Sequence, residues 1–210
     1  MRRRLTVILI TLILSTGLIG CASKVKFPTY YTLYVPPAVD MPTAGGTRGS
    51  VAVREFQSPA YLRQGAIVYR PSAEKVGFYN YQRWAVDPRE FLTSAIVDRL
   101  RASGRFAAVK IYDGRADVDF ILSGRLEKLE EVDYEGGVRV EVAISAQMTD
   151  LRSGKTVWAN AASETAEVNK RTVPSVVTEM SHAMDRAIQK LLASLTVSTT
   201  SNLEPRSDSP

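Results

Sequence analysis

The sequence predicts an α/β protein of the α+β type, in which a single mixed, largely antiparallel sheet carries two amphipathic helices. Two observations support this prediction. Several short segments alternate apolar and polar residues, which is typical of strands buried on one face. Two longer segments instead repeat apolar residues at helical spacing. Strands and helices that are each apolar on one side bury those sides against one another.

Four strands are expected in the first part of the chain, each rich in aromatic or β-branched residues. A segment rich in Pro and Gly follows the first of them and indicates a loop. In the fourth, alternation would place Tyr79 and Tyr81 on one face and Phe78 and Trp84 on the other. The four expected strands are residues 29–35, 50–56, 66–70 and 76–85.

The segment "DPREFLTSAIVDRLRASG" predicts the first helix, over residues 87–104. Asp87 can cap its start, Pro88 suits the first helical position, and Glu90 completes a pair resembling a capping box. Gly104 stands where a left-handed residue commonly ends a helix. The apolar face consists of Phe91, Leu92, Ala95, Ile96 and Leu100.

Strands return after this helix, at residues 105–113, 116–131, 138–148 and 156–168, the last three forming an antiparallel meander. The third of these strands alternates most strictly. Its apolar face is Val138, Val140, Val142, Ile144, Ala146 and Met148. A second long amphipathic helix is expected over residues 173–195. Its apolar stripe is Val177, Met180, Met184, Ile188, Leu191 and Leu195.

The N-terminus has the pattern of an export signal. Three arginines precede a short apolar run that small residues close, whereas a membrane-spanning helix needs roughly 20 apolar residues. The run ends in "LIGC", which resembles the lipobox of bacterial lipoproteins, so we expect residues 1–20 to be a lipoprotein signal peptide and Cys21 to carry the lipid. The alternative is an uncleaved anchor helix. Ala22 and Ser23 replace the Asp that resembles an inner-membrane retention mark, which favours the outer membrane and its periplasmic face.

These features divide the chain into four parts. Residues 1–20 are the expected signal peptide and residues 21–28 the lipidated cysteine and its tether. Residues 29–195 form a single periplasmic domain. Residues 196–210 lack apolar periodicity and are expected to be disordered.

The charge balance excludes a typical nucleic-acid binder. The chain has 27 basic and 22 acidic residues, and residues 1–20 hold three arginines and no acids, so 24 basic against 22 acidic remain without them. No dense basic stripe is left to follow a phosphate backbone. Nucleic acid is therefore not an expected partner.

Motifs for catalysis, cofactors or metals are missing, and we expect no catalytic, cofactor-binding or metal-binding residue. The one histidine, His182, lacks ligand partners at metal spacing and is expected at a solvated or boundary position. No glycine-rich phosphate loop and no nucleophile elbow occurs. The acidic run Glu130, Glu131, Asp133 and Glu135 is interpreted as a solvated hairpin rather than a calcium loop.

The aromatic segment "YNYQRWA" is the remaining candidate site. Tyr79, Tyr81 and Trp84 could form an exposed patch that contacts a partner or an acyl chain. The alternative, which aromatic strands usually favour, is that they belong to the core or to a sheet face.

Several segments, in order, resemble the PqiC family of auxiliary lipoproteins of ABC-type transport systems. They are "VAVREF" (51–56), "YLRQGAIVYR" (61–70), "YNYQRWA" (79–85) and the helix ending in "SGRFAAV" (103–109). "LRQGAIVYR" departs from the family, where an Asp-Arg-Pro-like turn would be expected before the Ile-Val pair. The resemblance implies a system with a permease, an ATPase and an MCE-domain protein that moves lipid between membranes.

Three functions follow as hypotheses. The first is a non-enzymatic outer-membrane lipoprotein that docks an MCE-type lipid conduit, with an MCE-domain protein as partner and homo-oligomerisation plausible because ring-like conduits favour symmetric partners. The second is a regulatory lipoprotein that binds a cell-envelope enzyme such as a cell-wall synthase. The third is a lipid carrier, which would need a large apolar pocket.

Overall fold

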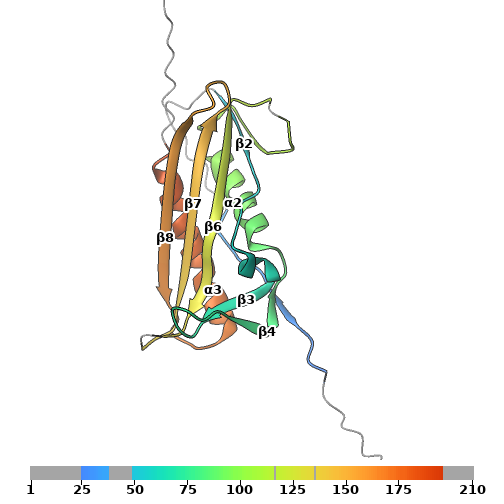
Figure 1. Ribbon diagram of the computed structural model, residues 1–210, viewed down its shortest axis with the longest axis vertical. Coiled ribbons are helices and arrows are strands. Elements are labelled where there is room, and N and C mark those ends of the chain that lie inside the picture. The colour runs from blue at the N-terminus through green and yellow to red at the C-terminus, as the bar shows by residue number, and fades with distance from the viewer. Residues whose placement is uncertain (1–24, 38–48, 116, 135, 196–210) are drawn as a thin grey trace, which may run out of the picture.

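The computed structural model describes residues 25–37, 49–115, 117–134 and 136–195. In this part of the chain one mixed sheet of eight strands carries two helices, which confirms the predicted fold class (Figure 1). The strands are β1 (Thr29–Tyr31), β2 (Ser50–Val53), β3 (Ala66–Arg70), β4 (Gly77–Trp84), β5 (Ala108–Ile111), β6 (Phe120–Val132), β7 (Arg139–Asp150) and β8 (Thr156–Glu167). The helices are α2 (Pro88–Ala102) and α3 (Val173–Ala193), and a short 3₁₀ helix, η1 (Ala60–Gln64), precedes β3.

The sheet divides at β6. One edge of β6 pairs with β7, and β7 with β8, in the expected antiparallel meander. The other edge takes two strands in parallel: β2 pairs with the start of β6 and β3 with its end. β5 extends the sheet beyond β2, and β4 and then β1 extend it beyond β3. Two short groups of strands therefore pair with the same edge of the long meander, β5 and β2 at the start of β6, and β3, β4 and β1 at its end.

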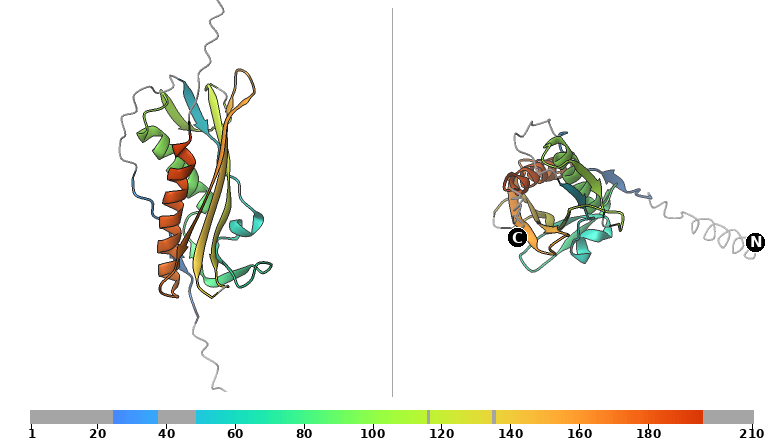
Figure 2. Two further views of the ribbon diagram at one scale, coloured as in Figure 1. Left: turned by 90° about the vertical axis from the view of Figure 1, so that its left-hand side faces the viewer. Right: turned by 90° about the horizontal axis from the view of Figure 1, so that it is seen from above.

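The helices cover one face of this sheet and lie beside each other (Figure 2). The predicted apolar stripe from Val177 to Leu195, on α3 and just after it, is buried along its whole length. The six alternate residues from Val138, which precedes β7, to Met148 are buried as well. Both predictions of a buried face are thus confirmed. Arg99 of α2 pairs with Asp185 of α3 and ties the two helices together. The core is the layer between the helices and the sheet.

The start and end of α2 follow the predicted Asp87, Pro88 and Gly104 signals, but the partner of Asp87 is Arg89 and not Glu90 of the expected capping-box pair. The carboxylate of Asp87 accepts a hydrogen bond from the backbone N–H of Arg89 at 2.9 Å, and Pro88 occupies the first turn. Gly104 follows the helix with φ of +61°, the left-handed conformation that favours glycine. The hydroxyl oxygen of Thr93, a buried residue of the helix, accepts a hydrogen bond from the backbone N–H of Phe56 at 3.0 Å. This bond anchors the chain between β2 and η1 to α2.

Several strands are shorter than predicted. β1 ends at Tyr31 because the chain then turns onto α3, where Leu33 is buried and the N–H of Tyr34 donates to Oγ of Ser181 at 3.1 Å. β2 ends at Val53, and the chain after it stays hydrogen-bonded to β6 without forming a regular ladder. The N–H of Arg54 donates to the carbonyl of Leu122 at 2.8 Å, and Gln57 forms an isolated bridge with Arg125. β5 and β6 begin later than expected, and their bounds are given above.

The expected signal peptide, Cys21 and the tail 196–210 lie outside the described residues.

Candidate functional site

The three candidate aromatic residues of β4 lie in three different environments. Trp84 belongs to the core, with 7% of its surface exposed, and its backbone N–H donates to the carbonyl of Gly65 at 2.8 Å. Tyr79 is partly buried, whereas Tyr81 is exposed. The structure does not bring these residues together as one patch.

An irregularity in the pairing of β3 with β4 accounts for this separation. Ala66 lies opposite Arg83, but Val68 lies opposite Phe78. Two steps along β3 therefore correspond to five along β4, and three extra residues interrupt the ladder. Regular alternation does not continue through the strand, so the faces expected from the sequence do not hold along its whole length.

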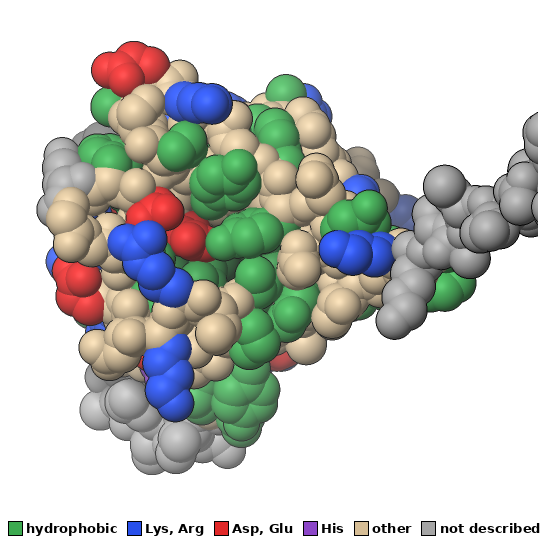
Figure 3. Space-filling model, turned by 90° about the horizontal axis from the view of Figure 1, so that it is seen from below, with side chains coloured by type: hydrophobic (Ala, Val, Ile, Leu, Met, Phe, Trp, Pro, Cys, Tyr) green, Lys and Arg blue, Asp and Glu red, His purple; other side chains and the backbone are tan. Residues whose placement is uncertain are grey.

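Tyr81 lies beside residues 25–31, which we call the N-terminal arm, rather than beside Tyr79 or Trp84. Nζ of Lys26 is 5.7 Å from the centre of the Tyr81 ring. The pairing of β1 with β4 sets Tyr30 opposite Arg83, two residues along β4 from Tyr81. We call Phe27, Tyr30 and Tyr81 the N-terminal aromatic surface, because all three are exposed on or beside this arm. Figure 3 shows hydrophobic side chains on the end of the molecule that is seen from below, which carries β3 and β4.

The acidic run at the end of β6 is not a solvated hairpin. Glu130 is completely buried and Glu131 is 6% exposed, so that prediction is wrong for both. The segment η1 and the strands β3 and β4 cover this end of β6 and supply the partners of both carboxylates. Asp133 is more exposed and pairs with Arg171 at 3.1 Å, while Glu135 lies outside the described residues.

Glu130 is held by an arginine and a tyrosine. Nε of Arg70 donates to its Oε1 at 2.5 Å, and the hydroxyl of Tyr61 donates to its Oε2 at 3.3 Å. The guanidinium of Arg70 also lies 5.8 Å from the centre of the Tyr61 ring and donates to the carbonyl of Ala73. The hydrogen bond to Glu130 raises the pKa of Arg70, and burial raises the pKa of Tyr61. Each carboxylate oxygen is thus satisfied within the protein, as expected of a structural ion pair.

Glu131 is held by the hydroxyl of Tyr79, which donates to its Oε2 at 2.8 Å. The ring of Tyr79 in turn lies 5.2 Å from that of Tyr69. Burial raises the pKa of the Glu131 carboxyl above its ordinary value, and the charge of Asp133 acts in the same direction. The hydrogen bond from Tyr79 acts against this shift.

We expect Glu131→Gln to reduce the loss of stability at rising pH. The pKa of Glu131 is higher in the folded than in the unfolded chain, so the folded state binds more protons between the two values. The free energy of unfolding then falls as the pH rises through that interval, which begins near the ordinary value of 4.5. The neutral amide of the variant would carry no such cost, and urea unfolding at pH 5, 6 and 7.5 measures the difference. Glu90→Gln, at an exposed position of α2, is the control, and an equal slope in all three proteins would contradict the prediction.

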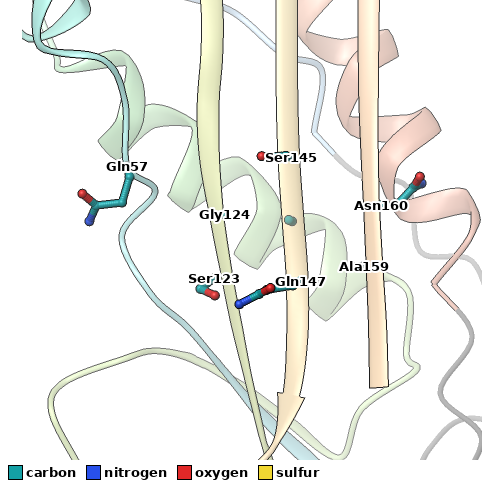
Figure 4. A pocket seen from close by; sticks show the side chains of 8 residues that line it. Gln57, Ser123, Gly124, Ser145, Gln147, Ala159 and Asn160 are labelled. Carbon is teal, nitrogen blue, oxygen red and sulfur yellow. The ribbon is translucent and has the colours of Figure 1, made fainter. Parts of the chain in front are cut away.

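A depression with a volume of ≈ 540 Å³ lies over β6, β7 and β8 (Figure 4). It is open, and none of its lining side chains is charged. A carrier of acyl chains would instead need a site that encloses its ligand. The lining residues are Gln57, Ser123, Gly124, Ser145, Ala146, Gln147, Ala159 and Asn160.

His182 is exposed, as expected, and its ring lies 3.4 Å from a carboxylate oxygen of Glu179. Among the residues that the structure describes, no three metal-binding side chains converge. Within the same ranges, neither helix combines the length and the apolar character needed to cross a membrane.

The fold defines a class of small α+β domains, in which one sheet is covered by two helices. Two solved structures share this fold. The protein XCC0632 from Xanthomonas campestris has a TM-score of 0.69 at 16% identity, covering 78% of this chain and 92% of that one. An uncharacterized protein has a TM-score of 0.62 at 15% identity, covering 81% of this chain and 99% of that one.

A family model identifies the chain more closely. The model for the ABC-type transport auxiliary lipoprotein component matches residues 31–192, and the chain belongs to this family. The resemblance to the PqiC family is thereby confirmed. Membership of a lipoprotein family indicates a membrane-anchored protein. No curated protein sequence matches the chain.

Proposed function

We propose that this chain is a non-enzymatic auxiliary lipoprotein of an MCE-type system that moves lipid between membranes, and that it docks the conduit at the outer membrane. The observation that carries the proposal is the family match, which runs through both helices and all strands except the first residues of β1. Cys21 is the lipidated residue, and an MCE-domain protein is the partner. Homo-oligomerisation is part of the proposal, because a symmetric conduit favours symmetric partners.

The shape of the domain supports this arrangement. The molecule is elongated, and the N-terminal arm leaves it at the end that carries β3 and β4 (Figure 1). The turn between β7 and β8 lies at the opposite end, where Arg152, Ser153 and Lys155 are exposed. With Cys21 in the outer membrane, this opposite end would face the periplasm and meet the conduit.

Cys21→Ala tests the anchor and the partnership together. Without a lipid anchor, we expect the protein in the membrane fraction to fall on the order of tenfold or more, because a multiply acylated cysteine holds its protein stably. A C-terminally tagged parent, purified from membranes in mild detergent, should retain an MCE-domain protein identified by mass spectrometry. The Cys21→Ala variant should lose that partner in cells, and Ser23→Ala, which leaves the cysteine in place, should keep it.

Other partners would overturn the proposal. Recovery of a cell-wall synthase instead would favour a regulatory lipoprotein. Recovery of no envelope protein, with the variant still in the membrane fraction, would contradict both the anchor and the docking role.

A further inference from the structure

Exposed apolar side chains are concentrated at one end of the described domain. Two others, Ile111 on β5 and Val157 on β8, lie on different strands away from it. The large hydrophobic side chains exposed on the N-terminal arm, on β4 and in the residues beside them are Val25, Phe27, Tyr30, Tyr34, Tyr81 and Val86. A concentration of this kind on one end usually marks a contact surface.

Basic side chains accompany the aromatic ones. Lys26 lies over the ring of Tyr81. Arg83, opposite Tyr30, is partly buried, and its guanidinium donates to the carbonyl of Gln64 at 2.7 Å. Arg63, on the neighbouring η1, is also exposed. Tyrosine with an apolar ring and a polar hydroxyl, next to lysine and arginine, is typical of surfaces that lie in the head-group region of a bilayer.

The length of chain before the arm limits how far this surface can lie from the lipid. Phe27 follows Cys21 by six residues, and an extended chain spans at most about 3.6 Å per residue, or roughly 20 Å in all. Each head-group layer is itself about 5–7 Å thick, from the difference between the whole bilayer and its hydrocarbon core. The N-terminal aromatic surface is therefore within reach of the membrane that would hold Cys21.

We propose that the N-terminal aromatic surface, with Lys26, inserts into the head-group layer of the membrane that anchors Cys21. The domain then stands with this end against the bilayer and does not swing freely on its tether. This inference rests on the proposed lipidation of Cys21. It adds a second contact to the membrane, made by the folded domain itself.

The inference can be tested with a chemical lipid anchor in place of the lipidation that occurs in cells. Because Cys21 is the only cysteine, the chain from residue 21 can be coupled through its thiol to a maleimide-bearing lipid in phosphatidylethanolamine–phosphatidylglycerol vesicles. Phe27→Trp then reports on its surroundings, since Trp84 and Trp158 are buried and give a constant background. We expect lipids brominated near the head group to quench the added fluorescence at least about twofold, as for an indole in the interface. Ile111→Trp, on β5, is the matched control and should not be quenched.

A second comparison separates insertion from mere proximity to the tether. Tyr30→Ser and Tyr81→Ser, added together to Phe27→Trp, should abolish most of the quenching if the surface inserts as a unit. Unchanged quenching, or equal quenching of the Phe27→Trp and Ile111→Trp proteins, would overturn the inference. A second copy of this chain could cover the surface in place of the membrane, and sedimentation of the uncoupled chain tests this. If the chain self-associates and the two serine substitutions abolish the association, the surface is a contact between copies and the inference is overturned.

Circular dichroism of each variant shows whether the fold is kept. The vesicle experiment uses no transport partner and no cellular lipidation. If it succeeds while Cys21→Ala has no effect in cells, the proposed function fails and the surface still binds lipid. If the cellular experiment succeeds and the vesicle experiment does not, only the inserted surface is lost.

Discussion

Arg70→Met is expected to lower the free energy of unfolding by about 3–5 kcal/mol, the usual cost of leaving a buried charge without its partner. Glu130 has no exposed surface and depends on Arg70 for its closest hydrogen bond. The hydroxyl of Tyr61, at 3.3 Å, is a longer contact and carries no positive charge. Methionine fills much of the volume of the arginine side chain, so the loss reports on charge rather than on a cavity. Urea unfolding at pH 7.5 measures it.

Two further variants make this prediction specific. Arg125→Met removes an arginine from an exposed pair, in which the side chains of Arg125 and Glu127 are 43% and 42% exposed, and should cost less than about 1 kcal/mol. Arg70→Met combined with Glu130→Leu should recover much of the stability, because apolar replacements of a buried pair are often neutral or better. A single-variant cost no larger than that of Arg125→Met would show that Glu130 has another compensating partner.

The parts of the fold that the sequence predicted are those that depend on local periodicity. The stripe of α3 and the alternate residues of β7 bury the same side chains that helical and strand spacing select. The capped start of α2 and its left-handed Gly104 are local in the same sense. Such features require only that one face of an element be covered, whichever element covers it.

The buried acids could not be predicted in this way, because their partners come from distant segments. Tyr61 and Arg70 precede Glu130 by 69 and 60 residues, and Tyr79 precedes Glu131 by 52. Only the parallel pairing of β3 with the end of β6 brings these groups together. One signal was present: the two acids stand between Leu129 and Val132, two apolar residues that are both buried.

The candidate aromatic site was predicted only in part. The three aromatic residues do lie on one strand, but the three extra residues opposite β3 divide them between the core, a partly buried hydrogen bond and the surface. The exposed residue, Tyr81, lies beside the N-terminal arm. From the sequence this segment was predicted only to be a tether and a strand. Contact with a partner or a lipid remains a prediction for Tyr79, Tyr81 and Trp84. Of these, Tyr81 is the residue with the exposure that such a contact needs.

Gly124→Ala is expected to destabilise the protein by about 2–3 kcal/mol, the cost of overpacking a filled core. A Cβ at Gly124 would lie 2.3 Å from Cε1 of Phe56 and 2.6 Å from the backbone carbonyl oxygen of Ser145. The ring is fully buried and cannot move aside into solvent, and the carbonyl belongs to the adjacent strand β7. Gly137→Ala is the control: its Cβ would meet only Oε2 of Glu167, at an ordinary 3.7 Å, and the change in urea stability should stay within about 0.5 kcal/mol.

A double variant shows whether Phe56 is the obstacle. Phe56→Ala alone should cost about 3–5 kcal/mol, since it leaves a cavity under α2. In that background Gly124→Ala should cost at least about 1 kcal/mol less than in the parent, a coupling typical of residues in contact. If the costs of the two substitutions simply add, the steric clash of the new Cβ is with the carbonyl of Ser145 alone. A measured coupling would instead show that Gly124 lets the Phe56 ring lie directly on β6. This contact would hold the chain between β2 and β3 in place.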